Sequence, residues 1–206
     1  MTVRELKAAA VLLAAGLSRR MGERNKLLIG IEGEPLVRRT AKAYLAAGVE
    51  VHVVLGHEAE QVRAALKDLA ISFALNPDYA QGQPTSVYAG IGSLAGDHAA
   101  IAVALADQAA LTAEDIRGLI SAFAADGSRR ILVPYYQDRR GNPVIFPAGL
   151  IEDMRSRGRN AAPRSFIDAN PELVYRYEAP NDHTVIDIDT PDDVIAFERR
   201  LQRQDC

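Results

Sequence analysis

A basic loop follows the first apolar run of the chain. The run ends at Gly16, and Arg19, Arg20, Arg24 and Lys26 follow in close succession. An ordinary turn needs no such concentration of cations. Arginine can grip a phosphate group with its planar fork, and lysine can neutralise one as a point charge. The pattern therefore predicts a polyphosphate site, with a merely solvated basic loop as the alternative.

Small residues lie directly before these cations. Ala14, Ala15 and Gly16 allow the backbone to approach a ligand closely, and successive N–H groups there can cradle phosphate oxygens. The spacing is neither that of a Walker loop, "GxxxxGK[ST]", nor that of a dinucleotide fingerprint, "GxGxxG". We therefore expect phosphate binding by a loop of another design.

Acidic residues follow two other apolar segments. Asp107 comes directly after one apolar run, and Asp187 and Asp189 end what we expect to be a further strand. A carboxylate at the end of a buried strand is costly unless it is solvated, paired or bound to a metal. Mg²⁺ takes few carboxylates and completes its shell with phosphate oxygens and water, so these residues predict a Mg²⁺ site. The alternative for Asp189 is that it, or Thr190, caps the helix that begins at Pro191.

Short apolar runs alternate with segments of helical period along the chain. Continuous apolar runs are typical of strands covered on both faces, whereas a spacing of three to four residues predicts helices. We expect strands at residues 8–15, 51–56, 71–75, 100–107, 130–136, 141–146 and 173–178. We expect helices at residues 35–47, 58–67, 86–94 and 112–124, and a last helix from residue 191. A hairpin with turn glycines at Gly30 and Gly33 is expected before the first helix.

This alternation predicts an α/β fold with a mixed, mainly parallel central sheet flanked by helices. No long linker divides the chain, so residues 1–206 are expected to form one domain. Its second half carries extra strands, and residues 135–185 are expected to cover the substrate. Ligands of open α/β sheets bind beyond the carboxyl ends of the strands. The basic loop and Asp107 both lie at such ends, which predicts a single site.

Composition and charge narrow the class of protein. A formal net charge of −3 over 206 residues does not argue for binding to nucleic acid or to an anionic membrane surface. The single cysteine, Cys206, permits no disulfide within the chain and fits a reducing compartment. Residues 1–16 faintly resemble a signal peptide, but cleavage would remove an obvious core strand. Because no stretch approaches the length of a spanning helix, we expect a cytoplasmic protein with no membrane partner.

Six motifs together carry a resemblance that none of them carries alone. They are "LAAGLSRRMG", "NKLL", "NPDYAQG", "LADQ", "GNPVIF" and "DIDTPDDV". The chain resembles the MobA-like nucleotidyltransferase family, and within it the molybdenum cofactor cytidylyltransferase branch, over residues 9–197. The resemblance implies a Rossmann-like nucleotidyltransferase fold. It also implies Mg²⁺-dependent transfer of CMP from CTP to the phosphate of a molybdopterin-type cofactor, with release of pyrophosphate.

The resemblance implies a role for each residue that matches the family pattern. Lys26 and Arg19 would hold the phosphates and, together with Asp107, form the catalytic group. Asp107 would be the main Mg²⁺ ligand, with Asp189 or Asp187 as the second. The residues implied to bind the nucleotide are Leu13, Ala14, Ala15, Gly16, Lys26, Asn76, Gly82 and Ser86. Residues 135–185 would bind the acceptor.

Three segments depart from the family pattern. Residues 82–87 read "GQPTSV" where relatives typically show "GxSxSL", so Ser86 is the hydroxyl that matches. Ala109 stands where a proline is usual. Residues 157–165 read "RGRNAAPRS" in place of the usual "GDkGAR", and this difference bears on which acceptor is bound.

Two other functions stay open on the sequence. A transferase for another phosphorylated acceptor, such as a sugar phosphate, would share the loop and the metal site but not the acceptor pocket. A non-catalytic carrier that delivers the cofactor to a molybdoenzyme client would need neither Lys26 nor Asp107.

Base selectivity is a separate question, because guanylyl-transferring relatives carry "LAGG" where this chain has "LAAG". That difference implies that Ala15 helps to select CTP over GTP.

Overall fold

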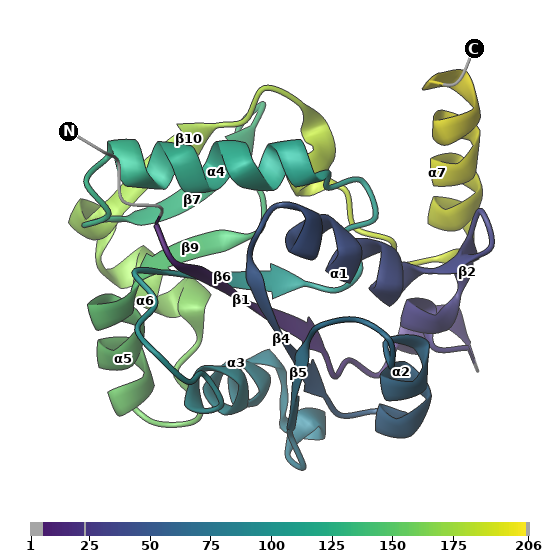
Figure 1. Cartoon of the computed structure of the whole chain (residues 1–206), viewed down its shortest axis with the longest axis horizontal. Helices are drawn as coiled ribbons and strands as arrows, with labels where there is room; N and C mark the ends of the chain where they lie inside the picture. The colour runs from purple at the N-terminus through teal and green to yellow at the C-terminus, as the bar shows by residue number, and fades with distance from the viewer. Residues whose placement is uncertain (1–5, 23, 205–206) are drawn as a thin grey trace.

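A central β-sheet runs through the molecule with helices on both faces (Figure 1). The computed structural model describes residues 6–22 and 24–204, so Cys206 lies outside the described residues. The eight-stranded sheet has the order β10-β7-β9-β6-β1-β4-β5, and β8 pairs with β7. Its strands are β1 (Ala8–Ala14), β4 (Glu50–Leu55), β5 (Ser72–Leu75), β6 (Ala100–Leu105), β7 (Ile131–Tyr136), β8 (Arg139–Arg140), β9 (Val144–Pro147) and β10 (Val174–Glu178).

Helices and short 3₁₀ turns connect these strands. The α-helices are α1 (Leu36–Ala46), α2 (Ala59–Ala65), α3 (Gln83–Gly92), α4 (Ala113–Ala125), α5 (Ala148–Ser156), α6 (Pro163–Ala169) and α7 (Pro191–Gln204). The 3₁₀ turns are η1 (Arg19–Met21), η2 (Lys26–Leu28), η3 (Tyr79–Gln81), η4 (Pro171–Leu173) and η5 (Asp182–Val185). No helix in residues 6–22 and 24–204 is both long enough and apolar enough to span a membrane.

The centre of the sheet is parallel and fully covered. Strand β1 reads AAAVLLA, pairs in parallel with β4 and β6, and is buried along nearly its whole length. A strand covered on both faces needs apolar side chains on both, which explains the unbroken run. Strand β9 enters antiparallel between β6 and β7, while β10 pairs in parallel with β7. The predicted mixed, mainly parallel sheet flanked by helices is therefore confirmed.

Two apolar clusters fix the helices against the two faces of the sheet. Helices α1, α2 and α4 pack on one face through side chains that include Tyr44 and Phe123. Helices α3, α5 and α6 pack on the other face through Val87, Met154 and Phe166. Figure 1 shows α1 and α4 on the side of the sheet opposite to α3, α5 and α6. Both layers leave the carboxyl ends of β1 and β6 uncovered by helix.

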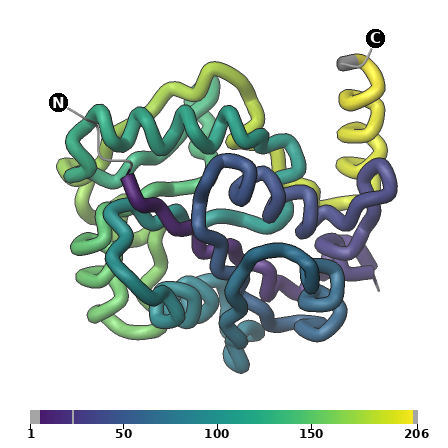
Figure 2. Tube along the Cα trace, in the orientation of Figure 1, coloured from purple at the N-terminus to yellow at the C-terminus, as the bar shows by residue number. Residues whose placement is uncertain are grey.

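A third, smaller cluster attaches the C-terminal segment to the hairpin. Strands β2 (Gly30–Ile31) and β3 (Glu34–Pro35) pair antiparallel. Glu32 and Gly33 both have positive φ in the turn, as a two-residue hairpin turn requires, so the expected turn at Gly33 is confirmed, whereas Gly30 lies in a strand. Ile31 packs with Ile188 and with Phe197 of α7. The trace in Figure 2 shows the last helix beside this early part of the chain.

The structure differs from the sequence prediction in two places. The strand expected to end at Asp187 and Asp189 is absent; η5 ends at Val185, and residues 186–189 form an irregular segment. Ile188 donates one backbone hydrogen bond to the Asp107 carbonyl at 3.0 Å, and its side chain is buried. The alternation of apolar and acidic residues therefore reflects the packing of this segment, and no strand pairs along it. Helices α5 and α6 were not predicted, because no element was assigned between the strands expected at residues 141–146 and 173–178.

Candidate functional site

A cavity of about 450 Å³ opens beyond the carboxyl ends of β1 and β6. This is the edge of the sheet where ligands of open α/β folds bind. Residues of four segments line it: the loop after β1, the η3–α3 junction, the end of β6 and the segment before α7. They are Leu13, Ala15, Gly16, Leu17, Ser18, Arg19, Arg20, Lys26, Leu27, Tyr79, Ala80, Gly82, Gln83, Ser86, Leu105, Asp107 and Asp189.

Most residues implied by the sequence resemblance lie in this lining, and three do not. The cavity brings together Leu13, Ala15, Gly16, Arg19, Lys26, Gly82, Ser86, Asp107 and Asp189. Ala14 is buried with its methyl in the cluster on the α1 face of the sheet. Asn76 and Asp187 also lie outside the lining. The sequence reasoning did not select Arg20, Ser18, Tyr79 and Gln83 as site residues.

Asn76 supports the cavity wall from behind. Its side chain is buried, and its Nδ2 donates to the hydroxyls of Thr85 and Ser86, each at 2.9 Å. Its Oδ1 accepts from the backbone N–H of Asp78 at 3.0 Å. Asn76 thereby ties the end of β5 to the first turn of α3. This side chain positions Ser86; that Asn76 lies near the base and ribose of a bound nucleotide, as the resemblance implies, stays a prediction.

The first turn of α3 faces the cavity. Gly82 caps this helix with a φ of 117°, a conformation that favours glycine. Gln83 and Ser86 follow it in the lining. The first N–H groups of a helix have no intrahelical partner and carry partial positive charge, so such an end suits an anion. The "NPDYAQG" segment therefore contributes a helix terminus as well as side chains.

Ser18 and Asn25 hold the basic loop in its conformation. The Ser18 hydroxyl accepts from the backbone N–H of Lys26 at 3.1 Å and donates to Asn25 Oδ1 at 3.3 Å. Asn25 Oδ1 also caps η2 by accepting from the Leu27 N–H at 3.0 Å. The side chains of Met21 and Leu27 are buried beneath the loop. These contacts fix the backbone on either side of the cations.

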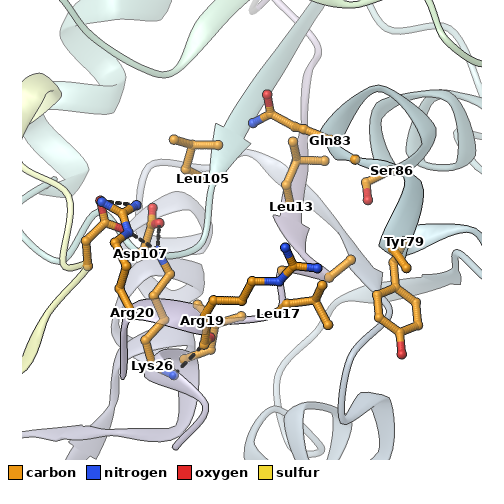
Figure 3. A pocket seen from close by; sticks show the side chains of 17 residues that line it. Leu13, Leu17, Arg19, Arg20, Lys26, Tyr79, Gln83, Ser86, Leu105 and Asp107 are labelled. Atoms are coloured by element: carbon orange, nitrogen blue, oxygen red, sulfur yellow. Dashed lines mark hydrogen bonds and ion pairs between the residues drawn. The ribbon is translucent and has the colours of Figure 1, made fainter. Parts of the chain in front are cut away.

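Lys26 lies between two carboxylates that come from distant parts of the chain. Its ammonium donates to Asp107 Oδ2, and to Asp189 Oδ1 at 2.7 Å. Arg20 pairs with the other oxygen of Asp189 at 2.8 Å. The exposed fractions of the Lys26, Asp107 and Asp189 side chains are 15%, 14% and 25%. Figure 3 shows these contacts at one end of the cavity, with Arg19 extending across it toward Leu13 and Leu17.

The two carboxylates also govern how Lys26 titrates. Burial of the ammonium acts to lower the pKa of Lys26, but the charge and hydrogen bond of Asp107, together with those of Asp189, outweigh it and raise the pKa. Burial, reinforced by the charge of Asp107, raises the pKa of Asp187 to about 6. Lys26 is therefore cationic at neutral pH, and Asp187 holds its proton more readily than an ordinary aspartate.

The carboxylates present a donor set that fits a divalent cation. Asp107 Oδ1 is buried and has no hydrogen-bond partner in the described part of the protein. Thr190 forms the helix cap with Asp193, donating from its N–H at 2.7 Å and accepting from the Asp193 N–H at 3.2 Å, so Asp189 is not needed for that role. Within residues 6–22 and 24–204, no group of three or more acidic, histidine or cysteine side chains could hold a metal alone. Phosphate and water oxygens would complete the shell, as Mg²⁺ prefers.

Fold and site together define a nucleotidyltransferase-like α/β protein, with a small-residue loop, cations and paired carboxylates at the carboxyl edge of its sheet. Residues 10–174 match the MobA-like NTP transferase domain, and the chain belongs to that family.

Individual relatives differ in the activity that their names give. The chain is 32% identical to nicotine blue oxidoreductase of Paenarthrobacter nicotinovorans, over 87% of this chain and 91% of that protein. It is 27% identical to the molybdenum cofactor cytidylyltransferase of Escherichia coli K12, over 92% of this chain and 95% of that protein.

Solved structures agree on the fold. A nucleotidyl transferase from Methanothermobacter thermautotroptrophicus matches with a TM-score of 0.80 at 24% identity, over 96% of this chain and 99% of that chain. A Mycobacterium tuberculosis H37Rv protein in complex with manganese matches with a TM-score of 0.72 at 21% identity, over 94% and 98% of the two chains.

Proposed function

We propose that this protein transfers CMP from CTP to the phosphate of a molybdopterin-type cofactor, with Mg²⁺ as its cofactor, and releases pyrophosphate. The observation that carries the proposal is the Lys26 ammonium held between Asp107 and Asp189 in the cavity beyond β1 and β6. Membership of the MobA-like NTP transferase family and the 27% identity to a cytidylyltransferase support it.

In this proposal the chain mainly positions reactants and stabilises charge. The backbone from Ala15 to Ser18 cradles the phosphates, and the cations Lys26 and Arg19 stabilise the charge that develops on pyrophosphate. Asp107 and Asp189 would hold Mg²⁺, and the bound ion would supply Lewis-acid polarisation of the phosphoryl oxygens. A phosphate monoester carries its second negative charge near neutral pH, so the acceptor needs no general base.

The acceptor would bind on the side formed by residues 135–185. Arg159 of the α5–α6 connection pairs with Asp78 at 2.9 Å, which brings that connection to the rim near η3. The connection holds the "RGRNAAPRS" segment that departs from the family pattern, so the choice of acceptor would be made there. A molybdoenzyme would receive the finished cofactor as the client.

A second candidate is an oxidoreductase activity on a compound such as nicotine blue. Its support is the 32% identity to nicotine blue oxidoreductase, which exceeds the identity to the cytidylyltransferase. Lys26 and Arg20 already balance the charges of Asp107 and Asp189, so Arg19 and the loop could hold a diphosphate without a metal.

One experiment separates these functions. Pyrophosphate release is measured with each of the four ribonucleoside triphosphates and Mg²⁺, with molybdopterin cofactor or a panel of sugar phosphates as acceptor. Parallel reactions follow oxidation of reduced nicotinamide dinucleotides by heteroaromatic acceptors. The proposal expects pyrophosphate from CTP with molybdopterin cofactor. Release only with a sugar phosphate changes the acceptor, and cofactor binding without release identifies a carrier. Nicotinamide oxidation without pyrophosphate release identifies the oxidoreductase.

A further inference from the structure

Two acidic and two basic side chains pair at one end of the cavity. Asp107 and Asp189 contribute two negative charges, and Lys26 and Arg20 contribute two positive charges, through contacts of 2.7 Å from Lys26 to Asp189 and 2.8 Å from Arg20 to Asp189. Lys26 bridges one oxygen from each carboxylate. A divalent cation that binds both carboxylates needs the position that this ammonium occupies.

Burial makes that competition strong. The side chains of Lys26 and Asp107 are both about six-sevenths buried, so water screens their attraction poorly. A free divalent cation would have to displace Lys26 from both carboxylates without offering the ammonium a new partner. A triphosphate would change this competition, because it brings negative charge that can pair with the ammonium and further oxygen ligands for the cation.

We propose that Lys26 closes the cation site of the nucleotide-free protein, so that a divalent cation and a triphosphate must enter together. This inference rests on the proposed function, since it concerns the same site. Lys26 is then a two-position residue: it bridges Asp107 and Asp189 in the free protein, and it contacts phosphate when nucleotide is bound. The buried Oδ1 of Asp107, which has no hydrogen-bond partner within residues 6–22 and 24–204, remains as a further oxygen for the cation.

The test measures Mn²⁺ binding to the whole protein without any nucleotide, from the loss of the free Mn²⁺ signal in electron paramagnetic resonance. Wild type is compared with Lys26→Met, and Lys26→Gln serves as a second neutral variant in case one of them folds poorly. Lys42→Met is the matched control, because Lys42 also pairs with a carboxylate, Glu34, but on the exposed face of α1.

Removing the ammonium should raise the affinity for Mn²⁺ by at least about tenfold, a usual size for the coupling between two ligands. Lys42→Met should bind Mn²⁺ as weakly as wild type does. The gain should disappear in the double variant Lys26→Met with Asp107→Asn, which locates it at this carboxylate.

Equal affinity of wild type and both Lys26 variants would overturn the inference, and so would a gain that survives Asp107→Asn. Because no nucleotide is present, these outcomes are independent of which transfer reaction the protein performs. A failure of the proposed function would instead appear as absent pyrophosphate release in an assay with CTP.

Discussion

At the scale of single residues, the charged cluster around Lys26 is better suited to binding than to folding stability. Desolvation of a buried ion pair largely offsets its attraction, so such a pair adds little to the free energy of unfolding. Among the residues that the structure describes, one buried oxygen of Asp107 has no hydrogen-bond partner, which costs stability unless a ligand uses it. Clusters of this kind are typical of functional sites.

The first prediction concerns Asp107. Asp107→Asn should preserve folding and reduce turnover by orders of magnitude, because an amide is a poor ligand for Mg²⁺ and no longer attracts Lys26. Asp189→Asn should have a smaller effect in the same direction. Pyrophosphate release at saturating Mg²⁺ measures both, and thermal unfolding reports on the fold. The control is Asp68→Asn, which removes an exposed carboxylate paired with Arg38. Near-normal turnover of Asp107→Asn would exclude it as a metal ligand.

The second prediction concerns base selectivity. A side chain added at Gly56 would clash with both the Ala15 methyl and Tyr79. The Ala15 methyl therefore forms part of a tightly packed wall. A purine needs more room than a pyrimidine at such a wall. Wild type should therefore prefer CTP over GTP by at least about tenfold in kcat/KM, since one methyl is worth roughly 10–200-fold.

Ala15→Gly should narrow this preference without reversing it, because base edges must also find hydrogen bonds. The measurement is kcat/KM for both nucleotides with the same acceptor. Ala14→Gly is the matched control, since its methyl faces the opposite side of the sheet. A wild-type preference for GTP would overturn the assignment to the cytidylyltransferase branch.

The sequence allowed Lys26 and Asp107 to be assigned to one site, but it did not predict that the two side chains pair directly. The cations and the strand-end carboxylate each have a local signal in residue type and position. Their contact does not, because 81 residues separate them. Arg20 was named among the cations of the loop, but its pairing with Asp189 was not predicted, because Asp189 lies far along the chain and nothing local distinguishes Arg20 from Arg19. Asn76 has a buried supporting role that depends on the hydroxyls of α3, which a linear pattern does not show.

At the scale of elements, continuous apolar runs located the central strands well. β1, β4 and β6 are buried on both faces, so their sequences carry a signal that is hard to miss. Helix α5 was missed although Ile151 and Met154 have helical spacing, because it follows β9 with no intervening loop. Residues 186–189 have strand-like alternation but no neighbouring strand to pair with. An alternating apolar pattern indicates that every second side chain is buried, and a segment outside a sheet can be buried in the same way.

The third prediction concerns the start of α4. Thr112 and Asp115 form a capping box there, and His183 and Asn181 of the distant η5 region hydrogen-bond to the same carboxylate. Burial acts to raise the pKa of Asp115, but the hydrogen bonds from His183, Asn181 and Thr112 outweigh it and hold the pKa well below its ordinary value. A carboxyl with a depressed pKa stabilises the fold above the unfolded pKa of about 3.9 and loses that contribution as the pH falls toward the folded value.

The free energy of unfolding should therefore decline below about pH 4, and Asp115→Asn should flatten that decline. Asp115→Asn should also lower the free energy of unfolding at neutral pH, where the contribution of the Asp115 carboxylate is greatest. Chemical denaturation at pH 6 and pH 3 measures both effects. Asp153→Asn, an exposed position on α5, should leave the pH dependence of wild type unchanged. An undiminished slope in Asp115→Asn would contradict the prediction.

At the scale of the whole molecule, one carboxylate of the site is held in place by the packing of the last segment of the chain. Asp189 precedes α7, and Phe197 of α7 is buried against the hairpin in a cluster with Ile31 and Ile188. The guanidinium of Arg39 lies 5.7 Å from the centre of the Phe197 ring. The position of one carboxylate thus depends on apolar packing outside the cavity.

The fourth prediction follows from this packing. Phe197→Ala should lower the free energy of unfolding by about 3 kcal/mol, and it should raise the Mg²⁺ concentration required for half-maximal turnover, because Asp189 is less well placed. Ile195→Ala is the control on the same helix, since Ile195 is 47% exposed and should change stability by no more than about 0.5 kcal/mol. Unaltered Mg²⁺ dependence in a destabilised Phe197→Ala protein would show that α7 does not position Asp189.

The bridge from Lys26 to its two carboxylates can form only late in the synthesis of the chain. Its partners lie 81 and 163 residues later in the chain. At about 5–20 residues per second, they leave the synthetic machinery roughly 4–16 s and 8–33 s after Lys26. Through that interval the ribosome carries a chain whose basic loop has one acidic partner or none. A nascent chain that stops before Asp189 therefore lacks the complete bridge, which forms only when this late segment reaches the loop that carries Lys26 and Arg20.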